Sequence, residues 1–362
     1  MTDRSPAIKP TGWNAFWFAP VSTTVLHRIR FLTGLVLCGW ILSFAGNQEA
    51  FLSLDGWFDR TAYIETNRPA DPNRPDAPTP VPIGWSIFYL AGSNRGLFDA
   101  LYWGSLAIVG LFTLGLATRI TGILTWVVVV SFLANPASSY DADFLLGILA
   151  FYLMIGYALL GFWNGHLSPL EYVLGPNDAF VFKRWLGDRR AGAAPVSYSA
   201  NATLRLVQIH FAIIVITSGL HKLQMADWWA GVALWYPLHP PLQTTADQLM
   251  QERGTAAVTL WFLSLIQYIA LAWQIAFPAF AWRGGRWRVV LIGGAIVGWL
   301  GCFFVLGLPL FGPIYLIGCL SYLTADEWQR IAGWFGSRFG MVAAKPARAA
   351  AADSHKIKVG SK

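Results

Sequence analysis

Long runs of hydrophobic residues recur along the chain, separated by shorter polar segments. A helix of about twenty apolar residues crosses the ~30 Å hydrocarbon core of a bilayer. A bilayer gives backbone polar groups no water to bind, so such segments form helices or closed barrels, and these runs lack the alternation of a barrel. The pattern predicts an all-α, polytopic membrane helix bundle. The eight predicted spans are residues 27–46, 97–117, 119–134, 143–163, 203–224, 255–282, 288–306 and 308–323.

The segments between and beyond the spans divide the chain further. The proline-rich stretch RPADPNRPDAPTPVP predicts an extended outer loop, and Ser168 with Glu171 and Thr324 with Glu327 have the spacing of capping boxes at helix starts. The predicted organisation is a cytoplasmic or interfacial segment (1–24), a transmembrane domain (25–324) with an outer loop (46–96) and a cytoplasmic loop (164–202), an interfacial amphipathic helix (325–340) and a disordered basic tail (341–362).

Composition agrees with a membrane protein. Of the 362 residues, 55% are hydrophobic and 12% charged, against roughly 45–50% and 25% in soluble domains. We therefore do not expect a soluble enzyme, a nucleic-acid-binding module or a disulfide-stapled secreted fold. The three cysteines, Cys38, Cys302 and Cys319, lie inside apolar runs and show no metal-ligand or disulfide spacing. No metal site is predicted.

The distribution of charge predicts the orientation in the membrane. With a cytoplasmic N-terminus, the inner segments hold 20 of the 26 Lys and Arg residues and 7 of the 19 acidic residues. The inner side then carries +13 and the outer side −6. Because Lys and Arg concentrate on the cytoplasmic side of membrane proteins, both termini are expected in the cytoplasm. The net charge of +7 is therefore the sum of a basic inner side and an acidic outer side, as expected for a protein inserted in a membrane, and it predicts no nucleic-acid partner.

Lys222 is the principal candidate for chemistry. It closes the fifth predicted span on the outer side, with Ser218 one turn earlier on the same face and Asp227 five residues later. Desolvation in an apolar cavity lowers the pKa of a lysine and makes its amine a usable base. The alternative interpretation is an interfacial lysine that caps the helix and faces water beside Trp228 and Trp229.

Other polar residues in or beside the spans have structural interpretations. Asp141 and Asp143 precede the fourth span, where one of them is expected to cap the helix that begins near Phe144. Three glutamines inside spans are expected to be interhelical hydrogen-bond partners, and three histidines to be structural. These are Gln208, Gln267 and Gln274, and His27, His210 and His221.

The fifth-span segment carries a family resemblance. The stretches RLVQIHFAIIVITSGLHKL and DWWAGVALWYPL resemble the signature of the HTTM (horizontally transferred transmembrane) family, which is related to the vitamin K-dependent gamma-carboxylase. Similar flanking stretches extend the resemblance over about residues 25–325: WSIFYLAG, GLATRITGILTWVVVVSFLANP, DFLLGILAFYL and GLPLFGPIYLIGCLSYL. The bacterial sporulation-delaying protein B-like members resemble this chain more than the carboxylase does.

The resemblance implies a role for Lys222 and also sets limits on it. In the carboxylase branch, the lysine in this Gly-x-x-Lys-Leu context is the base that deprotonates reduced vitamin K. Two histidines of that branch are replaced here by Ala142 and Trp299, and the extra lumenal domain is not expected. A true gamma-glutamyl carboxylase is therefore not expected, and a quinone cofactor is implied by the resemblance alone.

Two functions are weighed at this stage, beside a transporter, for which the sequence shows neither an inverted repeat nor paired broken helices although Pro278 and Pro309 could interrupt two spans. The first is a membrane-embedded enzyme that uses Lys222 as base on a lipid-soluble quinol or an exported peptide, with Asp227 or Asp143 as partner in an outer-facing apolar cavity. The second is a non-enzymatic membrane partner, maturation factor or immunity-type protein. Both place a multi-pass protein in the lipid bilayer, expected to be the bacterial cytoplasmic membrane.

Overall fold

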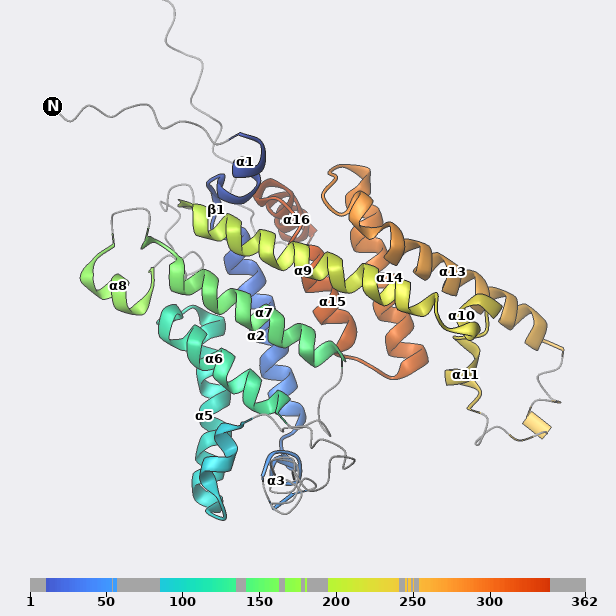
Figure 1. Ribbon diagram of the computed structural model, residues 1–362, viewed down its shortest axis with the longest axis horizontal. Coiled ribbons are helices and arrows are strands. Elements are labelled where there is room, and N and C mark those ends of the chain that lie inside the picture. The colour runs from blue at the N-terminus through green and yellow to red at the C-terminus, as the bar shows by residue number, and fades with distance from the viewer. Residues whose placement is uncertain are drawn as a thin grey trace, which may run out of the picture.

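A computed structural model gives the arrangement of the chain (Figure 1). It describes residues 11–53, 55–56, 85–134, 141–162, 167–176, 195–240 and 254–338, together with positions 180, 245, 247–248 and 250. Apart from two strands of two residues each, β1 (Val21–Ser22) and β2 (Val196–Ser197), the regular structure in these ranges is helical. The strands pair antiparallel and join the start of helix α2 to the start of helix α9.

Within the described residues, eight apolar helices form the bundle and confirm the all-α, polytopic fold. They are α2 (Thr24–Ser43), α5 (Arg95–Leu114), α6 (Thr118–Leu133), α7 (Asp141–Leu159), α9 (Tyr198–Lys222), α13 (Ala256–Phe280), α14 (Arg286–Leu306) and α15 (Phe311–Leu320). Shorter elements are α1 (Gly12–Phe18), α3 (Gln48–Leu52), the 3-10 helix η1 (Ile87–Ala91), α8 (Pro169–Leu174), α10 (Ala226–Ala230), α11 (Trp235–Leu238) and α16 (Ala325–Arg338).

Two of the eight predicted spans, 119–134 and 308–323, are already short in the sequence, and both form helices shorter than a full membrane span. Six of the helices are long and apolar enough to cross a membrane, whereas α6 has 16 residues and α15 has 10. At 1.5 Å per residue, α15 is about 15 Å long, half of the hydrocarbon thickness. Helix α15 begins at Phe311 and not at 308, because the chain leaves α14 through a left-handed glycine, Gly307, and Pro309 follows two residues later.

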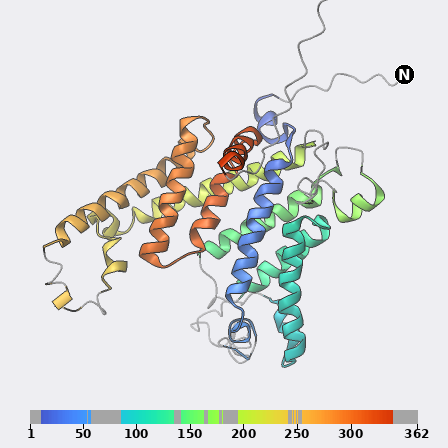
Figure 2. The same cartoon turned by 180° about the vertical axis from the view of Figure 1, so that it is seen from behind.

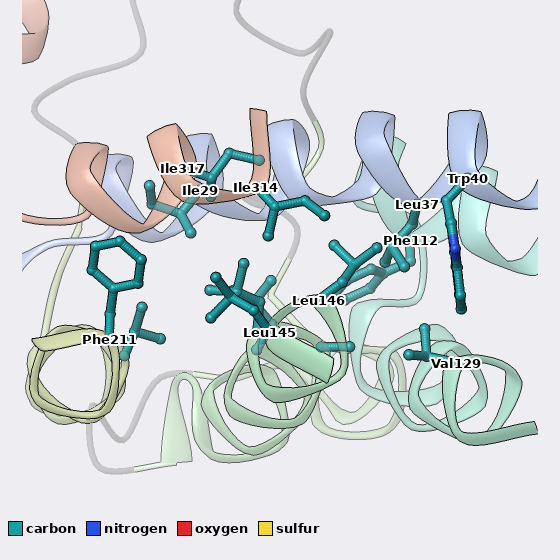
Figure 3. Close-up of a cluster of buried hydrophobic side chains, with 14 of the residues drawn as sticks. Ile29, Leu37, Trp40, Phe112, Val129, Leu145, Leu146, Phe211, Ile314 and Ile317 are labelled. Atoms are coloured by element: carbon teal, nitrogen blue, oxygen red, sulfur yellow. The ribbon is translucent and has the colours of Figure 1, made fainter. Parts of the chain in front are cut away.

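The main core lies between two layers of helices, as Figure 3 shows: α2 and α15 on one side, α6, α7 and α9 on the other. Its side chains include Ile29, Leu37, Trp40, Phe112, Val129, Leu145, Leu146, Phe211, Ile314 and Ile317. The hairpin of α13 and α14 packs beside α9 (Figure 2) and is largely exposed along its length, as lipid-facing helices are.

The ends of α7 and α8 are joined by a buried arginine. Arg119, in the first turn of α6, is 7% exposed. Its guanidinium donates hydrogen bonds to the carbonyl oxygens of Ala158, Leu160, Glu171 and Tyr172, at 2.7 Å for Leu160 and 2.9 Å for Glu171. Carbonyls at helix C-termini lack intrahelical partners and favour a cation.

Both predicted capping boxes are confirmed. The Ser168 hydroxyl accepts from the Glu171 amide at 3.3 Å, and the Glu327 carboxylate accepts from the Thr324 amide at 2.8 Å. Glu327 also pairs with Arg288 of α14, with 3.1 Å between Oε1 and Nε. Partial burial raises the pKa of Glu327, but the Thr324 amide and the Arg288 charge outweigh it and hold that pKa below its ordinary value. The pair ties the start of α16 to α14.

Parts of the predicted organisation fall outside the described residues. Of the outer loop at 46–96, α3 and η1 are described, whereas 57–84, with the proline-rich stretch, are not. The tail at 341–362 also lies outside them. Figure 1 places α1 and α16 near one end of the molecule and α3 at the opposite end.

The packing of α14 on α15 depends on a glycine. A Cβ atom at Gly312 would lie 1.8 Å from Cδ1 of Trp299, whereas one at Gly298 would meet nothing within 4 Å. We expect Gly312→Ala to lower the free energy of unfolding by about 1–3 kcal/mol, because the indole must move. Gly298→Ala is the matched control and should leave stability unchanged or raise it. Denaturant unfolding in detergent measures both; equal stability of the two variants would contradict this packing.

Candidate functional site

Lys222 is the last residue of α9, and its amine is held by neutral oxygens. Nζ donates to the Ser218 hydroxyl at 2.8 Å and to the Gln274 side-chain carbonyl of α13 at 3.0 Å. It also lies 5.3 Å from the centroid of the Trp228 ring. The side chain is half-buried, and Cys302 of α14 is close enough to interact with it electrostatically. Residues from three membrane helices thus surround the amine.

Local sequence explains why α9 and α13 meet here. A Cβ atom at Gly219 would lie 3.0 Å from the Gln274 Cβ, so a glycine allows the two helices to approach closely. Pro278 has no N–H for the carbonyl four residues earlier, which is that of Gln274. The α13 backbone therefore lacks one of its ladder bonds at the residue that binds the lysine.

A cavity of about 380 Å³ lies beside this cluster. Its walls come from the first turns of α7 and α15 and from the last two turns of α9. They consist of Ala142, Leu145, Ile214, Thr217, Ser218, His221, Phe311 and Tyr315. Ser218 belongs to both features, because its hydroxyl accepts the Lys222 hydrogen bond and also lines the cavity. Ser218 therefore links the Lys222 amine to the cavity: its hydroxyl bonds the amine, and the residue forms part of the cavity wall.

Tyr315 contributes to the cavity wall and packs against two aromatic rings. Its ring is packed edge-on to Phe211, with centroids 5.0 Å apart, and stacks on Phe311 at 5.5 Å. The hydroxyl itself has almost no accessible surface, and it lies beside the Gln274 side chain, which is close enough to interact with it. Sequence reasoning did not single out Tyr315, because a tyrosine in an apolar run gives no signal of its hydroxyl environment.

The structure does not bring the two predicted acidic partners to Lys222. Asp227 is exposed in the first turn of α10, and the extended residue Met225 separates that helix from α9, so Asp227 does not continue the lysine face. Asp143 is buried, but α7 begins at Asp141, which puts Asp143 inside the first turn instead of at a cap before Phe144. Gln274 takes the place that sequence reasoning had given to an aspartate.

The three glutamines are confirmed as interhelical partners. Gln208 donates to the Ser321 carbonyl at 2.8 Å, and Gln267 donates to the Trp228 carbonyl at 2.6 Å. Gln274 accepts from Lys222. Two of the histidines have tyrosine partners, as the structural interpretation expects: His27 with Tyr157 at 2.7 Å and His210 with Tyr152 at 2.9 Å.

The two residues that the predicted resemblance matches to histidines of the carboxylase branch lie at or near the cavity. Ala142 is part of its wall, and Trp299 packs on Gly312, near the start of α15. Within the described ranges, no group of three His, Cys, Asp or Glu residues has the arrangement of a metal site. The polar chemistry available here is that of an amine, hydroxyls, an amide, a thiol and the imidazole of His221.

Comparison of the chain with models of protein families, with curated proteins and with solved structures finds no match. The resemblance to the HTTM family therefore stays a prediction from the residues quoted above. In the part of the chain that it describes, the structure shows a helical bundle with six helices long and apolar enough to cross a membrane, and a polar cluster around Lys222.

Proposed function

We propose that this protein is an HTTM-like, membrane-embedded enzyme in which Lys222 acts as a base on a lipid-soluble quinol or an exported peptide. One observation carries the proposal: the Lys222 amine is bonded to Ser218, and Ser218 lines an apolar cavity. Gamma-glutamyl carboxylation is not proposed, because Ala142 and Trp299 replace histidines of that branch.

The hydrogen bonds of Lys222 suit a base. A neutral amine has two N–H donors and one lone pair, and Ser218 and Gln274 use both donors. The lone pair is then available to a substrate hydroxyl. In the proposed step the substrate O–H bond breaks, an N–H bond forms on Lys222, and the products are an ammonium and a quinolate. Because Ser218 lines the cavity and Lys222 is not among the lining residues, the proton passes through the serine: its hydroxyl turns to donate its proton to the lone pair of Lys222, and its oxygen takes up the substrate proton.

The proposed location is the outer half of the bacterial cytoplasmic membrane. The excess of Lys and Arg in the inner segments, 20 of 26, supports this orientation. In this orientation α1 and α16 mark the inner end of the molecule. Helix α9 starts near that end, and Lys222, its last residue, lies at the other end of the helix. A substrate would then enter from the outer leaflet.

An ionisable probe tests whether Lys222 can accept a proton from a ligand. A 4-nitrophenol that carries a long alkyl chain changes absorbance when it becomes a phenolate, and it is titrated with the purified protein in nanodiscs. A lysine that takes the proton lowers the apparent pKa of the bound probe by about one to three pH units. Lys222→Met should remove this shift, and the exposed Gln224→Ala should keep it. Superimposable titrations of wild type and Lys222→Met would rule out proton transfer.

A non-enzymatic role is the second candidate, and the Trp228 contact favours it. A lysine at a helix end, 5.3 Å from a tryptophan ring, is also the arrangement of an interfacial anchor. A partner, maturation or immunity-type protein would keep its function in Lys222→Ala and lose it when residues 68–82 are deleted. The enzyme proposal requires the opposite pattern.

A further inference from the structure

The Ser218 hydroxyl is bonded differently from other hydroxyls of the apolar helices. Serine and threonine hydroxyls inside helices commonly donate their proton to the carbonyl oxygen four residues earlier. Such bonds are made here by Ser105, Thr113, Thr121, Ser131, Thr217 and Ser264. Among the described residues Ser218 makes no such bond, and its hydrogen-bond partner is the Lys222 amine at 2.8 Å. The helix backbone therefore does not hold the serine proton.

The Lys222 amine is placed to accept that proton. Its other hydrogen-bond partner is the neutral side-chain carbonyl of Gln274, at 3.0 Å, and no carboxylate in the described part of the chain pairs with it. A neutral amine has a lone pair, and the 2.8 Å contact then serves a Ser218 hydroxyl that donates to Lys222. A serine paired in this way with a lysine base is an activated nucleophile.

We propose that Ser218 is a nucleophile, activated by Lys222, that cleaves a fatty acyl ester in the cavity. The proposal rests on the proposed function for its base and adds a second reaction, acyl transfer. In the first step the Ser218 oxygen bonds to the acyl carbon, the ester C–O bond breaks, and Lys222 passes the serine proton to the leaving alkoxide. In the second step water cleaves the acyl–serine bond, which releases the fatty acid and restores the hydroxyl.

The cavity sets the class of substrate. Its volume of about 380 Å³ is in the range of small-molecule pockets and holds an ester group with part of one acyl chain. Leu145, Ile214 and Phe311 supply apolar walls, and no described lining residue is acidic or a permanent cation. His221, three residues after Ser218, also lines the cavity and offers a nitrogen donor to the oxygen of a tetrahedral intermediate. An uncharged ester on an apolar chain fits this lining.

A fluorophosphonate with a long alkyl chain tests for the nucleophile, because an activated serine displaces its fluoride and keeps the phosphonyl group. Intact-protein mass spectrometry of the protein in nanodiscs should detect a single adduct, and peptide mapping should place it on Ser218. Ser218→Ala should carry no adduct. Lys222→Met should slow the labelling about 100-fold or more, which is the contribution of a general base.

Ser264→Ala is the matched control. The Ser264 hydroxyl lies outside the cavity and donates to the Leu260 carbonyl at 2.8 Å, so its loss should leave the labelling rate unchanged. Ser218→Cys keeps a nucleophile in place, and with p-nitrophenyl decanoate it should form a thioester that hydroxylamine cleaves. An adduct that persists in Ser218→Ala would overturn the proposal. So would a wild-type protein that stays unmodified, whether or not Ser218→Cys reacts.

The nitrophenol titration separates this proposal from the function proposed above. If the titration depends on Lys222 while Ser218 stays unlabelled, the nucleophile is refuted and the base remains. If Ser218 is labelled equally fast in Lys222→Met, the pairing of the two residues is refuted.

The source of the ester is found in acid-quenched samples from phospholipid nanodiscs without added ester. An acyl adduct on Ser218 with the mass of a phospholipid chain would support the nucleophile and assign membrane lipid as the acyl donor. An adduct that forms only with p-nitrophenyl decanoate would support the nucleophile and assign an ester from outside the bilayer.

Discussion

Replacing Arg119 with methionine is expected to destabilise the protein by at least about 3 kcal/mol, since hydrogen bonds to charged groups contribute roughly 1.5–3 kcal/mol each. The substitution keeps most of the side-chain volume but removes the donors to four carbonyl oxygens at the ends of α7 and α8. The carbonyl of Leu160, a buried residue, then loses its hydrogen bond with the guanidinium at a place with little access to water. Thermal unfolding in detergent, followed by circular dichroism, measures the effect.

Arg95 provides the control for this experiment. Its side chain is 78% exposed and its contact with Glu49 spans 3.6 Å, so Arg95→Met should change stability by less than about 1 kcal/mol. The two variants remove the same charge from helices of the same bundle. Equal and small effects would mean that the carbonyl cluster around Arg119 does not hold α7 and α8 together.

Replacing Lys222 with arginine is expected to abolish base catalysis although it keeps the positive charge. A guanidinium is not deprotonated in proteins and has no lone pair to offer. If Lys222 speeds the oxidation of a short-chain quinol by dioxygen, which yields quinone and hydrogen peroxide, Lys222→Arg should lower the protein-dependent rate about 100-fold or more. Quinol absorbance and oxygen uptake in nanodiscs follow the reaction.

Lys222→Met and Gln224→Ala complete this series. The methionine variant should be as slow as the arginine variant, and the exposed Gln224→Ala should match the wild type. An arginine variant with the wild-type rate would show that a fixed charge suffices. Lys222 would then be an interfacial residue, and the non-enzymatic candidate would be favoured.

Local signals in the sequence predicted local structure well. The spacing of Ser168 with Glu171 and of Thr324 with Glu327 predicted two helix starts, because a capping box involves residues within one turn. The i, i+4 spacing likewise put Ser218 on the face of Lys222, where it accepts the hydrogen bond. The length of the hydrophobic runs predicted all eight apolar helices of the described residues. It overestimated the length of α15, because apolar loop residues such as Leu308 and Leu310 were counted as part of the helix.

Contacts between helices could not be predicted in the same way. Gln274 was expected to bond another helix, but its pairing with Lys222 depends on how α9 and α13 are rotated and shifted against each other. Asp227 seemed near enough in sequence, yet the turn at Met225 redirects the chain. The cavity and the buried Tyr315 hydroxyl arise from three helices that are distant in sequence.

The first turns of α7 and α15 form part of the cavity wall, and Figure 1 shows the starts of these two helices close together. The peptide dipoles of a helix place roughly half a positive charge at its N-terminus. Two such ends facing one apolar space favour electron-rich groups and disfavour cations. Amphiphiles with a quaternary ammonium head should therefore be poor ligands, and a weak acid should ionise more readily in the cavity than in the surrounding lipid.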